Sequence, residues 1–186
     1  SLAWRSNGLD TPADLVKNSG QENVYAYRFD WDEEPKVLGM DFSLLLGAAH
    51  AFEIPFIMGD FDFGDQTSFL YDKNKTQEKD RLSSSMMSYW AEFARSGNPS
   101  TSNNSNLPKW TSWKSGGLDS FRIMILDTLS SGGPKMDKSY VPISNLGSIF
   151  DEDIRSNEVD DKCEFLNIAY SWVDNWKVKN NSCLGD

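Results

Sequence analysis

The chain has few of the residues that build metal sites: its 186 residues include one histidine and two cysteines. No C-x-x-C pair occurs, and one imidazole with two thiols falls short of a four-ligand zinc site, so we expect no metal. The sequence also lacks a Gly-rich phosphate loop, and no cofactor is expected. It contains no G-x-S-x-G segment, which excludes a serine nucleophile elbow within this chain.

Positive charge and long apolar runs are scarce as well. Lys and Arg number 18 against 28 Asp and Glu, which gives a net charge of −10 and a pI near 4.6. A field of this sign repels phosphates and argues against a nucleic acid or an anionic membrane as partner. No apolar run approaches the roughly 18 residues of a membrane span. The chain starts Ser1-Leu2-Ala3-Trp4, without an initiator Met or signal peptide, so we expect it to continue a longer protein.

Aromatic residues are plentiful, at 13%, and favour a packed core over disorder. Residues 23–31 alternate in a way that predicts a strand, and a second strand is predicted over 121–128. One face of the first strand is wholly aromatic, with Tyr25, Tyr27, Phe29 and Trp31.

The clearest helix is predicted over 77–96. Thr76 is expected to cap its start, and Gly97 is expected to end it. Apolar residues at a spacing of three to four form one face of this helix: Leu82, Met86, Tyr89, Trp90 and Phe93.

Two further helices are predicted, and two stretches have no clear pattern. Residues 1–20 suggest an amphipathic helix with a break, where Thr11 caps a new start and Pro12 follows. Residues 160–177 suggest a final helix. Residues 36–64 show no period, and residues 129–148 are Gly, Ser and Pro punctuation.

His50 is the one imidazole that acid–base chemistry in this chain could use. A lone histidine is usually structural, but small neighbours leave room for a substrate beside it, and loops often present catalytic groups. Glu53 follows three residues later. It could support His50 by a hydrogen bond from behind, or it could equally be an ordinary carboxylate in the first turn of a helix. Ala51 and Phe52 are candidate substrate contacts. The small neighbours are Gly47, Ala48, Ala49 and Ala51.

Several segments, in order and spacing, resemble the type-B carboxylesterases, the family that includes the cholinesterases. The resemblance covers roughly residues 4–176, and the residues in the matching segments resemble bacterial members most. The segments that carry it are Val24–Phe29, Gly47–Phe56, Tyr89–Pro99, Trp110–Trp113 with Leu126–Thr128, and Cys163–Phe165.

The resemblance implies an α/β fold in which residues 1–186 form the C-terminal part of a single α/β-hydrolase domain. This part would supply the last sheet strands, the catalytic-histidine loop and packing helices. The implied activity is hydrolysis of a small-molecule carboxylic ester through a Ser-Glu-His triad and an acyl-enzyme, with His50 as general base. The serine, the acid and the oxyanion hole would lie in an N-terminal part outside this chain. That part is the expected partner, as a missing segment or as a separate chain.

Two other readings stay open. A relative of the family that has lost its serine could serve as an adhesion or binding module, although retention of His50 favours the enzyme. A free-standing binding domain is disfavoured, because two strands alone would expose long unpaired edges.

The cysteines depart from the family pattern. In cholinesterases the cysteine at the C-terminal helix pairs with one shortly before the histidine, and residues 1–49 contain none. Cys163 would then pair with Cys183, pair with a cysteine in the N-terminal part, or stay free, and we favour the local bridge. A bridge implies an oxidising compartment, either periplasmic or extracellular.

Overall fold

The structure is a computed structural model, and it describes residues 2–114, 119–142, 145 and 168. The chain divides into two compact units. The main unit contains residues 22–114 and 119–138. The described residues of the other unit, called the N-terminal unit below, are 2–21, 139–142, 145 and 168.

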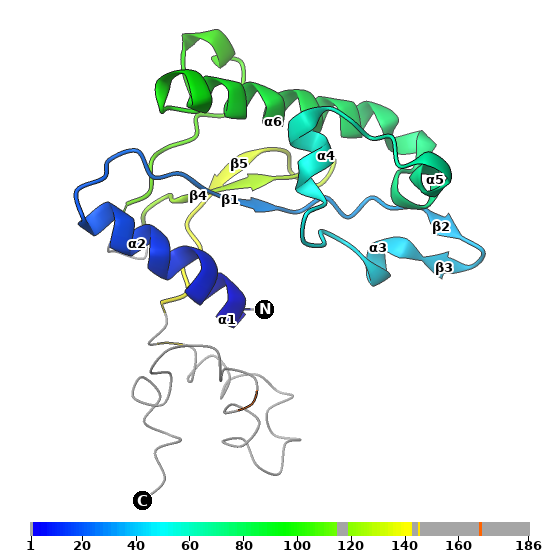
Figure 1. Cartoon of the computed structure of the whole chain (residues 1–186), viewed down its shortest axis with the longest axis horizontal. Helices are drawn as coiled ribbons and strands as arrows, with labels where there is room; N and C mark the ends of the chain where they lie inside the picture. Colours follow the sequence, from blue (N-terminus) through cyan, green and yellow to red (C-terminus); the bar gives the residue numbers. More distant parts are fainter. Residues whose placement is uncertain (1, 115–118, 143–144, 146–167, 169–186) are drawn as a thin grey trace, which may run out of the picture. The chain divides into compact units, whose positions relative to one another are not determined.

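The main unit is built on a three-stranded mixed sheet (Figure 1). Its strands are β1 (Ala26–Phe29), β4 (Ile123–Leu126) and β5 (Lys135–Asp137), in the order β1-β4-β5. β1 and β4 run parallel, with Ala26 opposite Ile123, whereas β4 and β5 run antiparallel. All four residues of β4 are buried, as expected for a central strand covered on both faces. The α/β class predicted from the sequence is confirmed.

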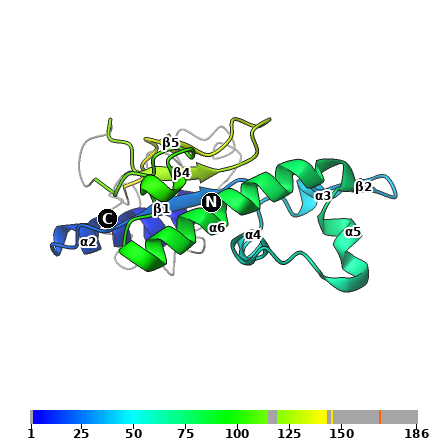
Figure 2. The same ribbon diagram turned by 90° about the horizontal axis from the view of Figure 1, so that it is seen from above.

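Helix α6 (Thr76–Ser96) lies over one face of this sheet (Figures 1 and 2). The aromatic face predicted for β1 contacts it: the Tyr27 and Trp90 rings meet edge to face at 5.0 Å, and the Tyr25 and Phe93 rings at 5.8 Å. Trp110, from the loop after α6, is 4% exposed and packs against the same face. These contacts close the core between sheet and helix. The buried residues of the core are Trp31, Phe56, Tyr71, Leu82, Met86, Tyr89, Trp110, Met124 and Leu126.

The stretch 36–64, which shows no periodicity in sequence, contains four short elements. They are β2 (Lys36–Val37), β3 (Met40–Asp41), α3 (Phe42–Leu45) and α4 (Glu53–Met58). Each spans six residues or fewer, so none is long enough for a hydrophobic period to emerge. β2 and β3 pair in a hairpin whose turn places Leu38 and Gly39 at positive φ. Further short elements are the 3₁₀ turns Gly64–Gln66, Lys73–Lys75 and Ser102–Asn104, and helix α5 (Thr67–Leu70).

Helix α6 ends as predicted, because Gly97 adopts a left-handed φ of 71° and donates its N–H to the Phe93 carbonyl. The expected cap at the other end is wrong. Thr76 is the first helical residue, and its hydroxyl donates to the Lys73 carbonyl of the preceding 3₁₀ turn. The chain enters α6 through that turn, so the hydroxyl satisfies a carbonyl outside the helix.

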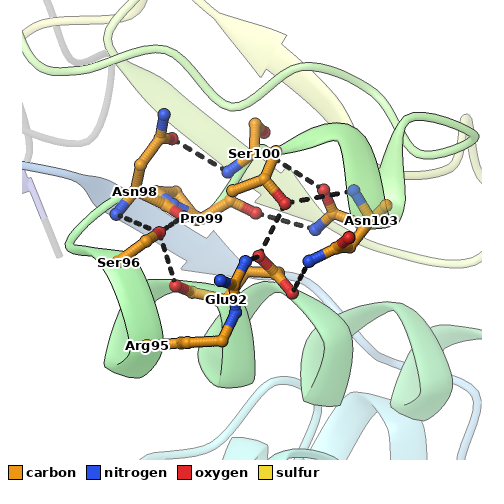
Figure 3. Close-up of polar contacts among 9 residues, drawn as sticks. Glu92, Arg95, Ser96, Asn98, Pro99, Ser100 and Asn103 are labelled. Carbon is orange, nitrogen blue, oxygen red and sulfur yellow. Dashed lines mark hydrogen bonds and ion pairs between the residues drawn. The ribbon is translucent and has the colours of Figure 1, made fainter.

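A cluster of polar contacts fixes the loop that follows α6 (Figure 3). The Glu92 carboxylate accepts from the Thr101 hydroxyl at 2.6 Å and the Asn103 amide at 3.0 Å, and it pairs with Arg95. These hydrogen bonds, Arg95 first, lower the pKa of Glu92 to about 2. The loop then carries Trp110 back to the core.

In the N-terminal unit, α1 (Leu2–Arg5) continues through a π turn, Ser6–Asp10, into α2 (Thr11–Asn18). The predicted break with a cap at Thr11 is wrong, because Asp10 and Thr11 both have right-handed helical dihedrals. Asp10 is fully buried instead. Its carboxylate pairs with Arg5 at 3.2 Å and accepts from the Val141 N–H at 2.7 Å.

The other predicted elements differ from the structure in length or position, or lie outside the described residues. The strands expected over 23–31 and 121–128 are shorter, and β5 lies in the stretch expected to be turns. The helix expected over 160–177 lies outside the described residues except for Ile168. Among the helices that are described, none has an apolar stretch sufficient to cross a bilayer.

Candidate functional site

His50 lies in a tight turn between α3 and α4, and its side chain is exposed. The Phe52 N–H donates to the Ala49 carbonyl at 3.1 Å, which closes a four-residue turn with His50 and Ala51 at its centre. No hydrogen bond joins the imidazole to any residue that the structure describes. The turn therefore presents the imidazole to its surroundings, with its ring nitrogens open to a partner.

Ala51 gives this turn its shape. Its φ is +74°, which makes it one of two non-glycine residues with positive φ in the described part of the chain. A positive φ at the third residue is the requirement of a type II turn, where glycine is usual. A side chain in this region costs about 1–2 kcal/mol. A methyl group is the smallest side chain that an L-residue can place here. The small residues around His50 thus allow this backbone conformation, and they also leave space beside the imidazole.

The turn leads without interruption into α4. The Ile54 N–H donates to the Ala51 carbonyl at 3.2 Å, so Ala51 already belongs to the first hydrogen-bonded turn of the helix. Glu53 is the first residue of α4, as one of the two sequence interpretations expected. Helix α4 ends at Gly59, which adopts a left-handed φ of 68°.

The middle of α4 is buried against the core. Phe56 is fully buried and contacts the rings of Phe29, Trp31, Phe61 and Tyr71, with centroids 5.0–6.1 Å apart. The buried Ser83 hydroxyl of α6 donates to the Phe56 carbonyl at 2.8 Å. The helix after the catalytic candidate is thus held both by packing and by a hydrogen bond from α6.

The first residue of α4 carries a charge that acts on β1. Tyr27 of β1 is half-buried; burial first, and then the negative charge of Glu53, raise its pKa. The tyrosine therefore keeps its proton.

Carboxylates gather where β1 and β4 end. The two strands are parallel, so their carboxyl ends share one edge, and the Asp30 N–H donates to the Leu126 carbonyl at 2.9 Å. Burial, followed by the charges of Asp30, Asp32 and Glu33, raises the pKa of Asp127. In open parallel sheets, ligands bind at this edge. The turn with His50 follows β1 from the same edge.

Glu34 is the most perturbed of these carboxylates. Its side chain is 6% exposed, and no described side chain hydrogen-bonds to either of its buried oxygens. Burial, together with the charges of Asp32, Glu33 and Asp41, raises its pKa to about 7. A neutral carboxyl is thus favoured at this position in the segment that leads from β1 to the turn.

The sequence located the turn but missed the residues that support it. Ala51 and Phe52 follow His50 in the turn and are half-buried. The expected bridge between Cys163 and Cys183 lies outside the described residues. Ser83 and Glu34 were not singled out. Their roles depend on contacts across the fold, for which a single sequence carries no signal. The described residues contain no cluster of three or more His, Cys, Asp or Glu able to hold a metal ion.

Comparisons with known proteins agree on one family. A sequence profile described as the carboxylesterase family matches residues 7–128. Over 99 residues the chain is 46% identical to acylcarnitine hydrolase from Mus musculus, and the match covers 53% of this chain and 16% of that protein. It is 36% identical over 99 residues to cocaine esterase from Homo sapiens, with the same coverage. The chain thus spans about a sixth of the length of these relatives.

A solved structure gives a weaker match. A PNB esterase is 30% identical, with a TM-score of 0.42, and the alignment covers 61% of this chain and 19% of that chain.

Proposed function

Because this chain belongs to the carboxylesterase family, we propose that it is the C-terminal part of a serine esterase, in which His50 acts as general base. The coarse function that follows from the family is hydrolysis of a carboxylic ester. The finer parts of the proposal are the Ser-Glu-His triad, the role of His50 and the two-part construction of the domain.

The reaction proceeds in two steps that both use one imidazole. His50 takes the proton from the serine hydroxyl as that oxygen attacks the ester carbonyl, and then gives the proton to the leaving alcohol. In the second step it takes a proton from water, which hydrolyses the acyl-enzyme and restores the serine. A glutamate orients the imidazole through the other ring nitrogen. The serine, this glutamate and the oxyanion hole belong to the N-terminal part.

The single observation that carries the proposal is the presentation of His50. It is exposed, hydrogen-bonds to no described residue, and sits on a turn fixed by a left-handed Ala51 and by a docked helix. A structural histidine is normally buried with its nitrogens satisfied. An imidazole fixed by its backbone but without partners is suited to receive them from elsewhere.

The sheet supports a second part of the same domain. β1 pairs on one side with β4 and has no strand on its other side within the described residues. Parallel strands occur almost always inside larger covered sheets. Large apolar side chains near the turn are also exposed, with Leu38 at 93% and Leu44 at 85%. We infer that the N-terminal part, whether joined to this chain or separate, adds strands beside β1 and covers these side chains.

The proposed substrate is a small-molecule ester, and the reaction as written uses no metal or cofactor. Two relatives carry names, acylcarnitine hydrolase and cocaine esterase, that refer to such compounds. A periplasmic or extracellular location is proposed with the bridge between Cys163 and Cys183.

The test is His50→Ala in the complete enzyme, with 4-nitrophenyl acetate as substrate. Loss of the base should lower kcat by about 10⁴–10⁶. Lys109→Ala, at an exposed position in the loop before Trp110, serves as the control and should keep kcat. Turnover within a few-fold of wild type in His50→Ala would overturn the assignment. A complete wild-type protein that releases no 4-nitrophenol above the uncatalysed rate would instead support the non-catalytic relative.

A further inference from the structure

The position of His50 follows the position of α4. Within the turn, the Phe52 N–H donates to the Ala49 carbonyl, and the Ile54 N–H donates to the Ala51 carbonyl and so joins the turn to the helix. The helix has six residues, fewer than two turns, so a shift of α4 moves the turn and the imidazole with it. His50 has no side-chain hydrogen bond within the described residues that would resist such a shift.

The C-terminal end of α4 receives a hydrogen bond from another helix. The N–H groups of Gly59 and Asp60 both donate to the Pro55 carbonyl. The Phe56 carbonyl accepts instead from the Ser83 hydroxyl of α6, at 2.8 Å. Ser83 is 3% exposed, so water does not compete for this hydrogen bond. Its hydroxyl thus satisfies a carbonyl in the last turn of α4 from outside that helix.

Ser83 is the middle member of a stripe on α6 formed by Lys79, Ser83 and Met87. These residues are spaced by four, so they lie one above another on the same side of the helix. The Lys79 ammonium lies 3.4 Å from the centroid of the Phe61 ring, in the loop after α4. Met87 lies against Gly59, where an added Cβ would come within 2.8 Å of the Met87 sulfur. The stripe therefore contacts the last turn of α4 and the loop that follows it.

The hydrogen bond restricts α4 in a way that apolar packing does not. Phe56 contacts four aromatic rings, but the burial of apolar surface has no preferred direction. Such packing holds α4 against the core and still tolerates a small rotation or slide. A hydrogen bond weakens steeply as its angle departs from linear. The bond from Ser83 therefore restricts both the rotation and the axial position of α4 on α6.

We propose that Ser83 is a positioning residue for His50: its hydroxyl holds the Phe56 carbonyl and thereby sets where α4 places the turn that carries the imidazole. This inference rests on the proposed role of His50 as general base. Ser83 touches neither the ester nor the reacting atoms in this assignment, and the triad acid still orients the imidazole ring. Without the hydroxyl the buried carbonyl has lost its donor, and α4 is expected to shift toward another one.

The main experiment is Ser83→Ala in the complete enzyme, with 4-nitrophenyl acetate as substrate. A displacement of a catalytic group by about 1 Å can cost about 10²-fold in rate. Ser83→Ala should lower kcat about 10- to 100-fold and leave KM within about twofold of wild type, because binding of the ester does not use this hydroxyl. Initial rates over a range of ester concentrations measure both constants.

Two matched controls remove a hydroxyl elsewhere. Ser85→Ala, on the same helix, loses a hydrogen bond to the Arg81 carbonyl of α6 itself, at 2.9 Å, and should keep kcat. Tyr89→Phe loses a hydrogen bond to the Pro108 carbonyl, at 2.6 Å, while its ring stays buried. This variant should lower the urea midpoint of unfolding and also keep kcat, because its hydroxyl does not contact α4.

A further readout tests whether Ser83 acts through His50. In a His50→Ala background the base is gone, so adding Ser83→Ala should leave the residual rate within about twofold. Ser83→Cys nearly keeps the size of the side chain and carries a weaker donor, so its kcat should fall about 3- to 10-fold. If Ser83→Ala does not fold, Ser83→Cys decides the question, and wild-type kcat in that variant overturns the inference.

The outcomes separate this inference from the proposed function. If His50→Ala lowers kcat as expected and Ser83→Ala keeps full kcat, Ser83 does not position the base and the triad assignment stands. A kcat loss in Ser83→Ala that Tyr89→Phe matches, or that persists in the His50→Ala background, also overturns the inference. An active His50→Ala overturns the proposed function itself.

Discussion

The last turns of α6 and the segment between β1 and α4 each contain a glutamate, and the two lie in opposite environments. Glu92 accepts hydrogen bonds from Thr101 and Asn103 and pairs with Arg95, all within about ten residues of sequence. Glu34 is buried and has no hydrogen bond from a described side chain. Their pKa values move in opposite directions, to about 2 and to about 7.

This difference shows where the polar groups of each region find their hydrogen-bond partners. The Glu92 carboxylate takes its partners from α6 and from the loop that follows it (Figure 3). The segment before α4 has exposed leucines, a positive φ at Leu38 and an unsatisfied carboxyl. These features are those expected of a segment that meets the proposed N-terminal part. Three substitutions test this contrast in the complete enzyme.

The largest effect on stability is expected for Phe56, in the buried middle of α4, the helix that follows His50. Phe56→Ala removes a ring packed among four others and should lower the free energy of unfolding by about 3–5 kcal/mol. The control is Met58→Ala on the same helix, where the side chain is 71% exposed and the change should stay within about 0.5 kcal/mol. Urea denaturation measures both. Similar losses in the two variants would contradict the packing described for α4.

The second substitution, Glu34→Gln, tests the unsatisfied carboxyl. Its folded pKa lies above the unfolded value, so the favourable contribution is complete below about pH 4.5 and is lost as pH rises through about 7. The variant should match wild type at pH 4.5 and exceed its stability at pH 8 by about 1–2 kcal/mol, after allowance for solvent screening. Urea midpoints at the two pH values measure this. A variant that is less stable at pH 8 would show that the carboxylate has a cationic partner.

The smallest effect is expected for Glu92→Gln. The lowered pKa means that ionised Glu92 contributes stability above about pH 4.5, and this contribution disappears as pH falls toward 2. The variant should melt slightly below wild type at pH 7, and the gap should narrow between pH 4.5 and 3. Thermal unfolding followed by circular dichroism measures the gap. A gap that widens on acidification would contradict the network around Glu92.

The sequence predicted the elements that are long enough for one face to show a hydrophobic period. The aromatic face of β1 and the apolar face of α6 are both visible as periods, and they meet in the core. The position of the His50 turn followed from a resemblance over Gly47–Phe56. The extent of α4 was not predicted, because six residues make fewer than two turns, and β5 was missed because three residues show no alternation.

The supporting contacts of the site were beyond the sequence for a different reason. Ser83 contacts Phe56 across 27 positions of the chain, and a serine has an ordinary explanation as a residue of a helix. Its second role becomes visible only when α4 and α6 are placed side by side.

The backbone at Ala51 also limits how this region can be redesigned. Libraries that vary the residues around a catalytic base usually treat each position as equally open. Here the φ of +74° favours glycine or asparagine at position 51 and admits alanine at a cost, whereas a β-branched residue would force the turn to change its type. A mutagenesis scheme around the proposed catalytic base should therefore hold this position constant.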